Sequence, residues 1–271
     1  MKRVPTITAA ILLLAISICS TRTAARAAEP DAASIVKRVK EALEPARPSL
    51  RIMILKINSS EGFATQWTLG QARSQVNGAD WILTVVLKPA DARGIALLAQ
   101  QQPGTVAVQY SYLPAVRRVR EITPMAAYEP FFGTDFTYED LGFVRFGGQE
   151  KLDGLETHDG TKAYKLEEPL ANNPYYSKVI TWVAVDTGLP IERDLDDVDG
   201  KLFLSERFED VKTVDKVPTI MKIVSRNVQS GGSSEIDVTS VKYDKQAPAG
   251  MFDPKHLSNA ANDAFWKTVT H

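Results

Sequence analysis

Pairs of turn-forming residues divide this chain into short runs in which apolar and polar side chains alternate. Asn77-Gly78 suits a two-residue hairpin turn, because both residues tolerate the positive φ angles that such a turn needs, and Asp199-Gly200 marks another turn. Between the turns the side chains alternate with a period of two, as in residues 63–69. This pattern predicts one antiparallel meander. A sheet of about ten strands must then curl into a barrel or a half-barrel.

The first residues have the features of a secretory signal peptide. A positively charged start precedes an apolar run at residues 7–18, and the small residues Ala25 and Ala27 stand where a signal peptidase reads. The apolar run is short for a membrane span, although an uncleaved anchor is the alternative interpretation. We expect residues 1–27 to be removed and residues 28–271 to fold as a single domain in the periplasm.

Composition excludes some classes of function. Cys19 is the only cysteine and falls within the predicted signal peptide, so the mature chain would have no thiol for catalysis, disulfides or metal binding. Cleavage would remove four basic and no acidic residues, which changes the formal net charge from −1 to −5. An acidic chain lacks the basic surface that nucleic acids bind, and no phosphate-binding glycine loop is present. We therefore expect no nucleic-acid partner and no cofactor.

An amphipathic helix is predicted at the start of the mature chain. Asp31 is a suitable helix-capping residue. Ile35, Val36, Val39 and Leu43 recur at helical spacing. This apolar stripe either packs in the core or forms a lid over a cavity, and both interpretations remain open.

Motifs for catalysis or metal binding are weak in this sequence. His158, His256 and His271 lack the close spacing of a zinc site, no G-x-S-x-G motif is present, and we interpret the histidines as exposed loop residues. The acidic run at residues 194–200 could hold calcium, but Leu195 stands at the first ligand position. An acidic hairpin is the favoured interpretation. We predict no catalytic residue and no metal site, and expect that the protein is not an enzyme.

Residues 106–141 combine an aromatic strand, a basic strand and an acidic turn. Opposite charges this close in sequence can pair and hold the loop in place. They could also contact a ligand head group or a partner, and a pair of catalytic carboxylates is a third interpretation. The basic residues are Arg117, Arg118 and Arg120, and the acidic residues are Asp135, Glu139 and Asp140.

Large apolar side chains on successive predicted strands could face a common interior. In a small closed barrel they would fill the core, whereas in a half-barrel loosely covered by helices they would line a cavity for an acyl chain. The sequence does not decide whether the interior is a filled core or a hollow cavity. The predicted lining residues are Trp67, Leu69, Trp81, Leu83, Val85, Val108, Tyr110, Tyr112, Trp182 and Phe203.

Three short motifs stand out between residues 50 and 257. They are Tyr-Leu-Pro-Ala at 112–115, Gly-Thr-Asp-Phe-Thr-Tyr-Glu-Asp-Leu at 133–141 and Asp-Thr-Gly-Leu-Pro at 186–190. As a set they resemble the bacterial outer-membrane lipoprotein-sorting family, the LolA-like periplasmic carriers. The resemblance implies a mainly β (α+β) fold, in which helices cover the concave face of a strongly curved antiparallel half-barrel sheet. It also implies a hydrophobic cavity between the helices and the sheet.

The residues and the resemblance together lead to three functional hypotheses. The first is a non-catalytic periplasmic carrier that binds a lipid or lipoprotein acyl chain in a hydrophobic cavity, for outer-membrane lipoprotein sorting or lipid transport. Its candidate partners are an inner-membrane exporter and an outer-membrane acceptor. The second is an envelope regulatory or scaffold protein that binds a protein partner through the curved sheet. The third is a hydrolase of envelope lipids that uses Asp135, Glu139 and His158.

Overall fold

The computed structural model describes the chain except for residues 1–29, 44, 103–104, 106, 143–145 and 271. The predicted signal peptide therefore lies outside the described residues. Residues Asp31–His271 form one unit. Within its described part, no helix is both long enough and apolar enough to cross a membrane.

A single antiparallel sheet of 13 strands dominates the fold. The mainly β half-barrel predicted from the sequence is confirmed. The strands are β1 (Ser49–Asn58), β2 (Ala64–Val76), β3 (Ala79–Lys88), β4 (Ala96–Gln101), β5 (Val108–Leu113), β6 (Arg118–Ile122), β7 (Lys151–His158), β8 (Thr161–Pro169), β9 (Tyr176–Ala184), β10 (Pro190–Asp197), β11 (Leu202–Val214), β12 (Val217–Asn227) and β13 (Ser233–Tyr243).

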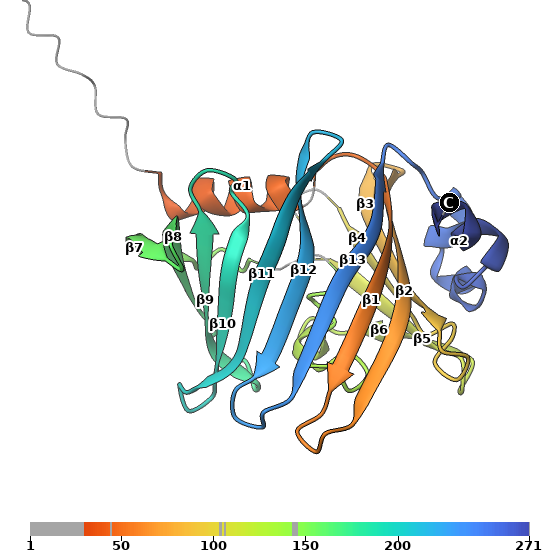
Figure 1. The fold of residues 1–271 in the computed structure, drawn as a ribbon, viewed down its shortest axis with the longest axis horizontal. Coiled ribbons are helices and arrows are strands. Elements are labelled where there is room, and N and C mark those ends of the chain that lie inside the picture. Colours follow the sequence, from red (N-terminus) through yellow and green to blue (C-terminus); the bar gives the residue numbers. More distant parts are fainter. Residues whose placement is uncertain (1–29, 44, 103–104, 106, 143–145, 271) are drawn as a thin grey trace, which may run out of the picture. The chain divides into compact units, whose positions relative to one another are not determined.

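The first and last strands of the chain pair with each other in the middle of the sheet. The order is β6-β5-β4-β3-β2-β1-β13-β12-β11-β10-β9-β8-β7, so two meanders, β1 to β6 and β7 to β13, meet at the β1–β13 ladder. That ladder runs from Ser49 opposite Tyr243 to Asn58 opposite Ser233. The strands β6 and β7 remain as edges (Figure 1). The sheet is therefore open, and the closed-barrel alternative is excluded.

The predicted hairpin turns form where the sequence placed them. Asn77 and Gly78 have φ angles of 54° and 80° and join β2 to β3. The acidic run forms the turn between β10 and β11, where Asp197 Oδ1 accepts hydrogen bonds of 2.9 Å from the N–H groups of Asp199 and Lys201. This carboxylate therefore closes a hairpin, as the favoured interpretation predicted.

The predicted first helix is present and is capped as expected. Asp31 Oδ1 accepts a 2.8 Å hydrogen bond from the Ser34 N–H, and Ile35 and Val39 pack against Val183 on β9. The helix thus lies on the same face of the sheet as the side chain of Val183. The helical elements are α1 (Ala32–Leu43), η1 (Ala126–Tyr128), η2 (Ala249–Phe252), η3 (Pro254–Asn259) and α2 (Asp263–Thr270).

The connection between the two edge strands lies across one face of the sheet. Because β6 and β7 are consecutive in the chain but lie at opposite edges, this connection must bridge the sheet. Residues 123–142, the crossing segment, lie on the face that curves around them, which we name the inner face (Figure 1). Phe131, Phe136 and Leu141 of this segment are buried there. The strand residues of this inner core include Met53, Leu55, Trp67, Leu69, Val86, Leu97, Ile236 and Val238.

The C-terminal helical elements cover the opposite, outer face of the sheet. Phe252, Leu257 and Trp266 pack in one core with Leu83 on β3. The helix α2 packs closely on this face, because Gly70 on β2 leaves room for the Trp266 ring.

The contact between Gly70 and Trp266 makes a prediction about stability. A Cβ atom at position 70 would lie 2.7 Å from the Trp266 ring, so Gly70→Ala should lower the free energy of unfolding by about 1–3 kcal/mol through overpacking. Urea unfolding would measure this change in the free energy of unfolding. Gly154→Ala is the matched control, because Gly154 also lies in a strand but has no atom within 4 Å of the added methyl group. Equal stability of Gly70→Ala and the wild type would contradict this packing.

Candidate functional site

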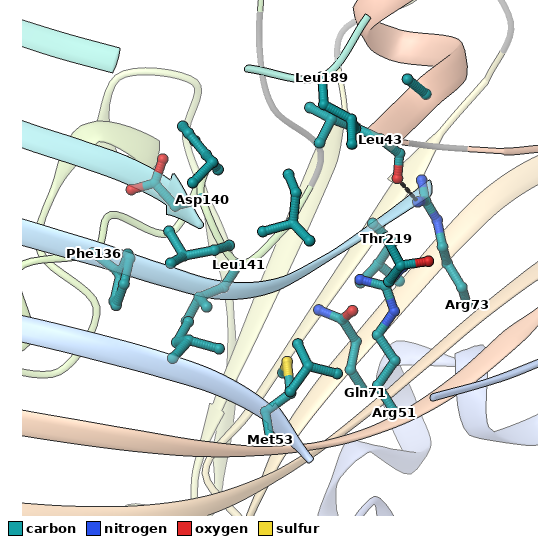
Figure 2. Close-up of a pocket in the computed structure, with 18 of the residues that line it drawn as sticks. Leu43, Arg51, Met53, Gln71, Arg73, Phe136, Asp140, Leu141, Leu189 and Thr219 are labelled. Atoms are coloured by element: carbon teal, nitrogen blue, oxygen red, sulfur yellow. Dashed lines mark hydrogen bonds between the residues drawn. The ribbon is translucent and has the colours of Figure 1, made fainter. Parts of the chain in front are cut away.

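A pocket lies between the inner face of the sheet, the end of α1 and the crossing segment. Its volume is about 110 Å³. It is lined by strands from both meanders, so it spans the β1–β13 ladder, and Figure 2 shows its labelled side chains. The apolar lining residues include Leu43, Met53, Ile82, Phe136, Leu141, Leu189, Phe208, Ile220, Ile223, Ile236 and Val238.

One end of the pocket is cationic. Arg51, Gln71 and Arg73 lie together on β1 and β2, as Figure 2 shows. Arg73 Nη1 donates a 2.8 Å hydrogen bond to the carbonyl oxygen of Leu43, the last residue of α1. Arg51 Nη2 lies 3.4 Å from the Tyr243 hydroxyl oxygen. Arg51 Nε is buried and has no hydrogen-bond partner among the described residues.

A buried cluster of ionisable groups forms another part of the wall. Arg193 on β10 is 4% exposed, and its Nη1 lies 2.9 Å from Asp140 Oδ1 and 3.3 Å from Glu206 Oε2. Glu139 Oε2 is 4.0 Å from Arg193 Nη2. Asp140 Oδ2 also accepts 2.6 Å hydrogen bonds from the N–H and the hydroxyl group of Thr137. One guanidinium therefore ties the crossing segment to two strands of the second meander.

Burial and the neighbouring charges shift the pKa of Arg193 in opposite directions. Burial alone would lower the pKa of Arg193, but the carboxylates of Glu206, Asp140 and Glu139 outweigh it and raise that pKa. Burial, followed by repulsion from Asp140, raises the pKa of Glu206 well above its ordinary value, although Arg193 opposes this shift. The cluster thus keeps its guanidinium charged, and Glu206 retains a proton at pH values at which an exposed glutamate ionises.

The predicted lining residues do not line this pocket in the described part of the chain. Trp67 and Leu69 do lie on the inner face, where the crossing segment packs over them. Half of the predicted set belongs to the core of the outer face, under the C-terminal helical elements. These residues are Trp81, Leu83, Val85, Tyr110 and Tyr112.

The remaining three predicted lining residues are scattered. Val108 is 38% exposed. Phe203 packs against Tyr176, with 6.1 Å between ring centroids. Trp182 stacks on His158, with 4.3 Å between ring centroids. The inner position of β3 that does line the pocket is Ile82, which neighbours the predicted residues along the strand but points to the other face.

The acidic residues of the crossing segment have partners on distant strands. Asp140 pairs with Arg193, and Asp135 Oδ2 accepts a 2.8 Å hydrogen bond from the Ser234 hydroxyl on β13. The arginines predicted as partners are exposed on or next to β6 and form no ion pair with these acids among the described residues; they are Arg117, Arg118 and Arg120.

His158 differs from the exposed loop residue that the sequence predicted. It ends β7, and its Nε2 lies 2.7 Å from Glu192 Oε2 on the outer face. His158, Asp159 and Glu192 place three possible metal-ligand atoms within 4.8 Å of one another. However, Arg207 forms ion pairs with both carboxylates. This neighbouring cation accounts for the acidic pair without a metal ion.

Sequence reasoning missed the charged residues that matter most in the pocket. Arg193 lies two positions before the buried Leu195, and Glu206 lies two positions after the buried Leu204. Residues two apart on a strand share a face, so this spacing was a signal for inward charges. Arg51 alternates with apolar neighbours in the same way.

Comparisons with known proteins identify the fold. A family model described as "uncharacterized protein" matches residues 78–259, about two thirds of the chain. No curated protein matches the chain.

Three solved structures share the fold over 83% of this chain. A domain named for outer membrane lipoprotein sorting, from Vibrio parahaemolyticus, is 23% identical, with a TM-score of 0.73 and 97% of its own chain covered. A DUF1329 family protein from Desulfovibrio piger is 22% identical, with a TM-score of 0.74 and 96% covered. A LolA superfamily protein from Nitrosomonas europaea is 19% identical, with a TM-score of 0.66 and 98% covered. The resemblance read from the sequence motifs is confirmed at the level of the fold.

The buried cluster predicts an unusual pH dependence of stability. Because the pKa of Glu206 in the folded protein lies well above the ordinary 4.5, the folded state binds the extra proton. Stability is lost as the pH rises from about 4.5 through the folded pKa. Glu206→Gln lacks this titration, so its free energy of unfolding relative to that of the wild type should rise by up to about 1.4 kcal/mol for each pH unit crossed.

Urea unfolding between about pH 4 and pH 8 measures this difference. Glu235→Gln is a control of opposite sign, because hydrogen bonds from Lys222 and Lys56 lower the pKa of Glu235 to about 2. Its ionised form stabilises the fold above about pH 4.5, so Glu235→Gln should be less stable than the wild type there. A gap between Glu206→Gln and the wild type that does not change with pH would contradict the raised pKa.

Proposed function

This chain belongs to the family of uncharacterized proteins whose model covers residues 78–259, and from its LolA-like fold and its pocket we propose that it is a non-catalytic periplasmic carrier. Its ligand is the acyl chain of a lipid or a lipoprotein, which binds in the inner-face pocket. The observation that carries the proposal is an apolar pocket enclosed by a helix and the crossing segment on the concave face of a half-barrel sheet. Each methylene group removed from water contributes about 0.8 kcal/mol, so a chain binds there with few polar contacts.

The size of the pocket requires one of its covers to move. Its volume of about 110 Å³ is below the roughly 150 Å³ of an engineered cavity that holds benzene, so a long chain does not fit without displacement. The helix α1 is the cover best suited to move. It rests on the sheet through a short stripe that includes Ile35 and Val39, and Arg38 and Arg73 form its hydrogen bonds with the loop after β9 and with β2. The lid interpretation of the first helix belongs to this proposal.

The placement of the candidate catalytic groups favours a carrier over a hydrolase. Asp135 lies on the inner face beside Ser234, and Glu139 lies there beside Arg193. His158 lies with Glu192 on the outer face. The sheet thus separates His158 from the two carboxylates, and general acid–base catalysis requires the groups within hydrogen-bond reach of one substrate.

The route of the cargo follows from the proposed location. A signal peptide would place the carrier in the periplasm, between an inner-membrane exporter and an outer-membrane acceptor. Burial of the chain keeps it from water during transit, and release then depends on an acceptor that binds the chain more tightly. The names of the structural relatives support this role only by analogy of fold.

A substitution that fills the pocket tests the proposal. Ile223 lines the pocket and is partly buried, so Ile223→Trp should lower the lipid content of protein purified from bacterial envelope by about tenfold, because the new ring displaces about two methylene groups of the ligand. Native mass spectrometry with lipid extraction measures the occupancy. Val211→Trp is the matched control, because Val211 is a strand residue of similar shape that is 44% exposed.

The wild type should carry lipid near one to one, and Val211→Trp should carry the same amount. A wild-type protein that shows only its apo mass, also after incubation with phospholipid, would contradict the carrier function. That result would favour the envelope scaffold that binds a protein partner through the curved sheet.

A further inference from the structure

An unsatisfied cation marks one end of the pocket. In the part of the chain that the structure describes, the buried Nε atom of Arg51 has no hydrogen-bond partner, and its Nη2 has a 3.4 Å contact with the Tyr243 hydroxyl. Within the described residues, no carboxylate lies within ion-pair distance of Arg51. Arg51 is half-buried, and a buried N–H donor without an acceptor in such a side chain calls for an explanation.

We propose that this end of the pocket binds the anionic head group of a single-chain amphiphile, with the head group on Arg51 and the acyl chain along the apolar wall. This inference rests on the carrier function and names the class of ligand. A carboxylate or phosphate oxygen is an acceptor that a guanidinium binds with short, charge-assisted hydrogen bonds. Arg73 and Gln71 lie beside Arg51 (Figure 2) and supply further donors to the same place.

The charges of the pocket also fix the direction in which the ligand lies. Asp140 and Glu206 lie together at Arg193, and Figure 2 shows Asp140 on the side of Phe136, apart from Arg51 and Arg73. A negative head group at that side would be repelled and would displace the buried pairs of Arg193. The head group therefore stays at Arg51, and the chain extends over Met53 toward the aliphatic side chains of β12 and β13.

The apolar wall separates this site from a simple anion site. A free anion at Arg51 would leave the surfaces of Ile223, Ile236 and Val238 exposed in the pocket. An attached chain covers them and gains about 0.8 kcal/mol for each buried methylene group. The shared chemistry is thus an anion covalently attached to a hydrocarbon chain, and the head group can be a carboxylate or a phosphate.

Calorimetric titration of the mature protein with decyl ligands tests the inference at neutral pH. Decanoate and decyl phosphate represent the two anionic head groups, decanol removes the charge, decyltrimethylammonium reverses it, and inorganic phosphate removes the chain. The wild type should bind at least one of the two anionic decyl ligands about 10- to 100-fold more tightly than decanol. It should bind inorganic phosphate and decyltrimethylammonium more weakly than decanol.

Variants of Arg51 assign this preference to one residue. Arg51→Met keeps an unbranched side chain without the charge and should remove the preference for the anionic ligand over decanol. Arg51→Lys should retain part of the preference for the anionic ligand. Arg118→Met is the matched control, because it removes the same charge from an exposed position on β6 and should leave the preference unchanged.

The outcomes separate this inference from the carrier function. Equal affinity of the wild type for decanoate, decyl phosphate and decanol would overturn the anionic head group but leave acyl-chain binding intact. Absence of binding for every decyl ligand would overturn both. Inorganic phosphate that binds as tightly as decyl phosphate would show an anion site without a chain and would also overturn the inference. The wild-type series decides these cases even if Arg51→Met does not fold.

Discussion

The pairing of the first strand with the last holds the rest of the structure in place. The β1–β13 ladder joins two meanders, and its paired residues lie 175 to 194 positions apart in the sequence. It places consecutive strands, β6 and β7, at opposite edges of one sheet. The connection between them must then cross the inner face, where its aromatic side chains form the core. The pocket spans the same ladder, so the site depends on a long-range contact whose formation carries a large loop-closure entropy cost.

The buried charges give this arrangement its specificity. The crossing segment has little regular structure, but Asp140 reaches Arg193 on β10 and Asp135 reaches Ser234 on β13. A buried ion cluster adds little net stability compared with an apolar core, yet removing one partner is costly. The cluster therefore acts mainly by fixing the path of the segment. This path leaves the space between the sheet and α1 that we assign to the ligand.

Local sequence patterns predicted the helix and the hairpin turns, whereas contacts between distant parts of the chain determine where the pocket lies. The Asn77-Gly78 hairpin and the cap of α1 at Asp31 follow from chemistry within a few residues. The strand β7 was missed, because its side chains are mostly exposed and Gly154 interrupts the pattern. The faces of β3 could not be assigned, because that strand is apolar on both sides and both sides are covered. Leu83 was therefore predicted to line the cavity, whereas Ile82 lines the pocket in the structure.

The central claim is that a hydrocarbon chain occupies the inner-face pocket. Nuclear Overhauser effects between a ¹³C-labelled fatty acid and the labelled methyl groups of the protein test it most directly. The account predicts contacts from the chain to Ile223 and Ile236 in the pocket. It predicts none to Leu83 and Val85 in the core of the outer face. Contacts to the outer-face methyl groups, with none to the pocket, would contradict the assignment of the site.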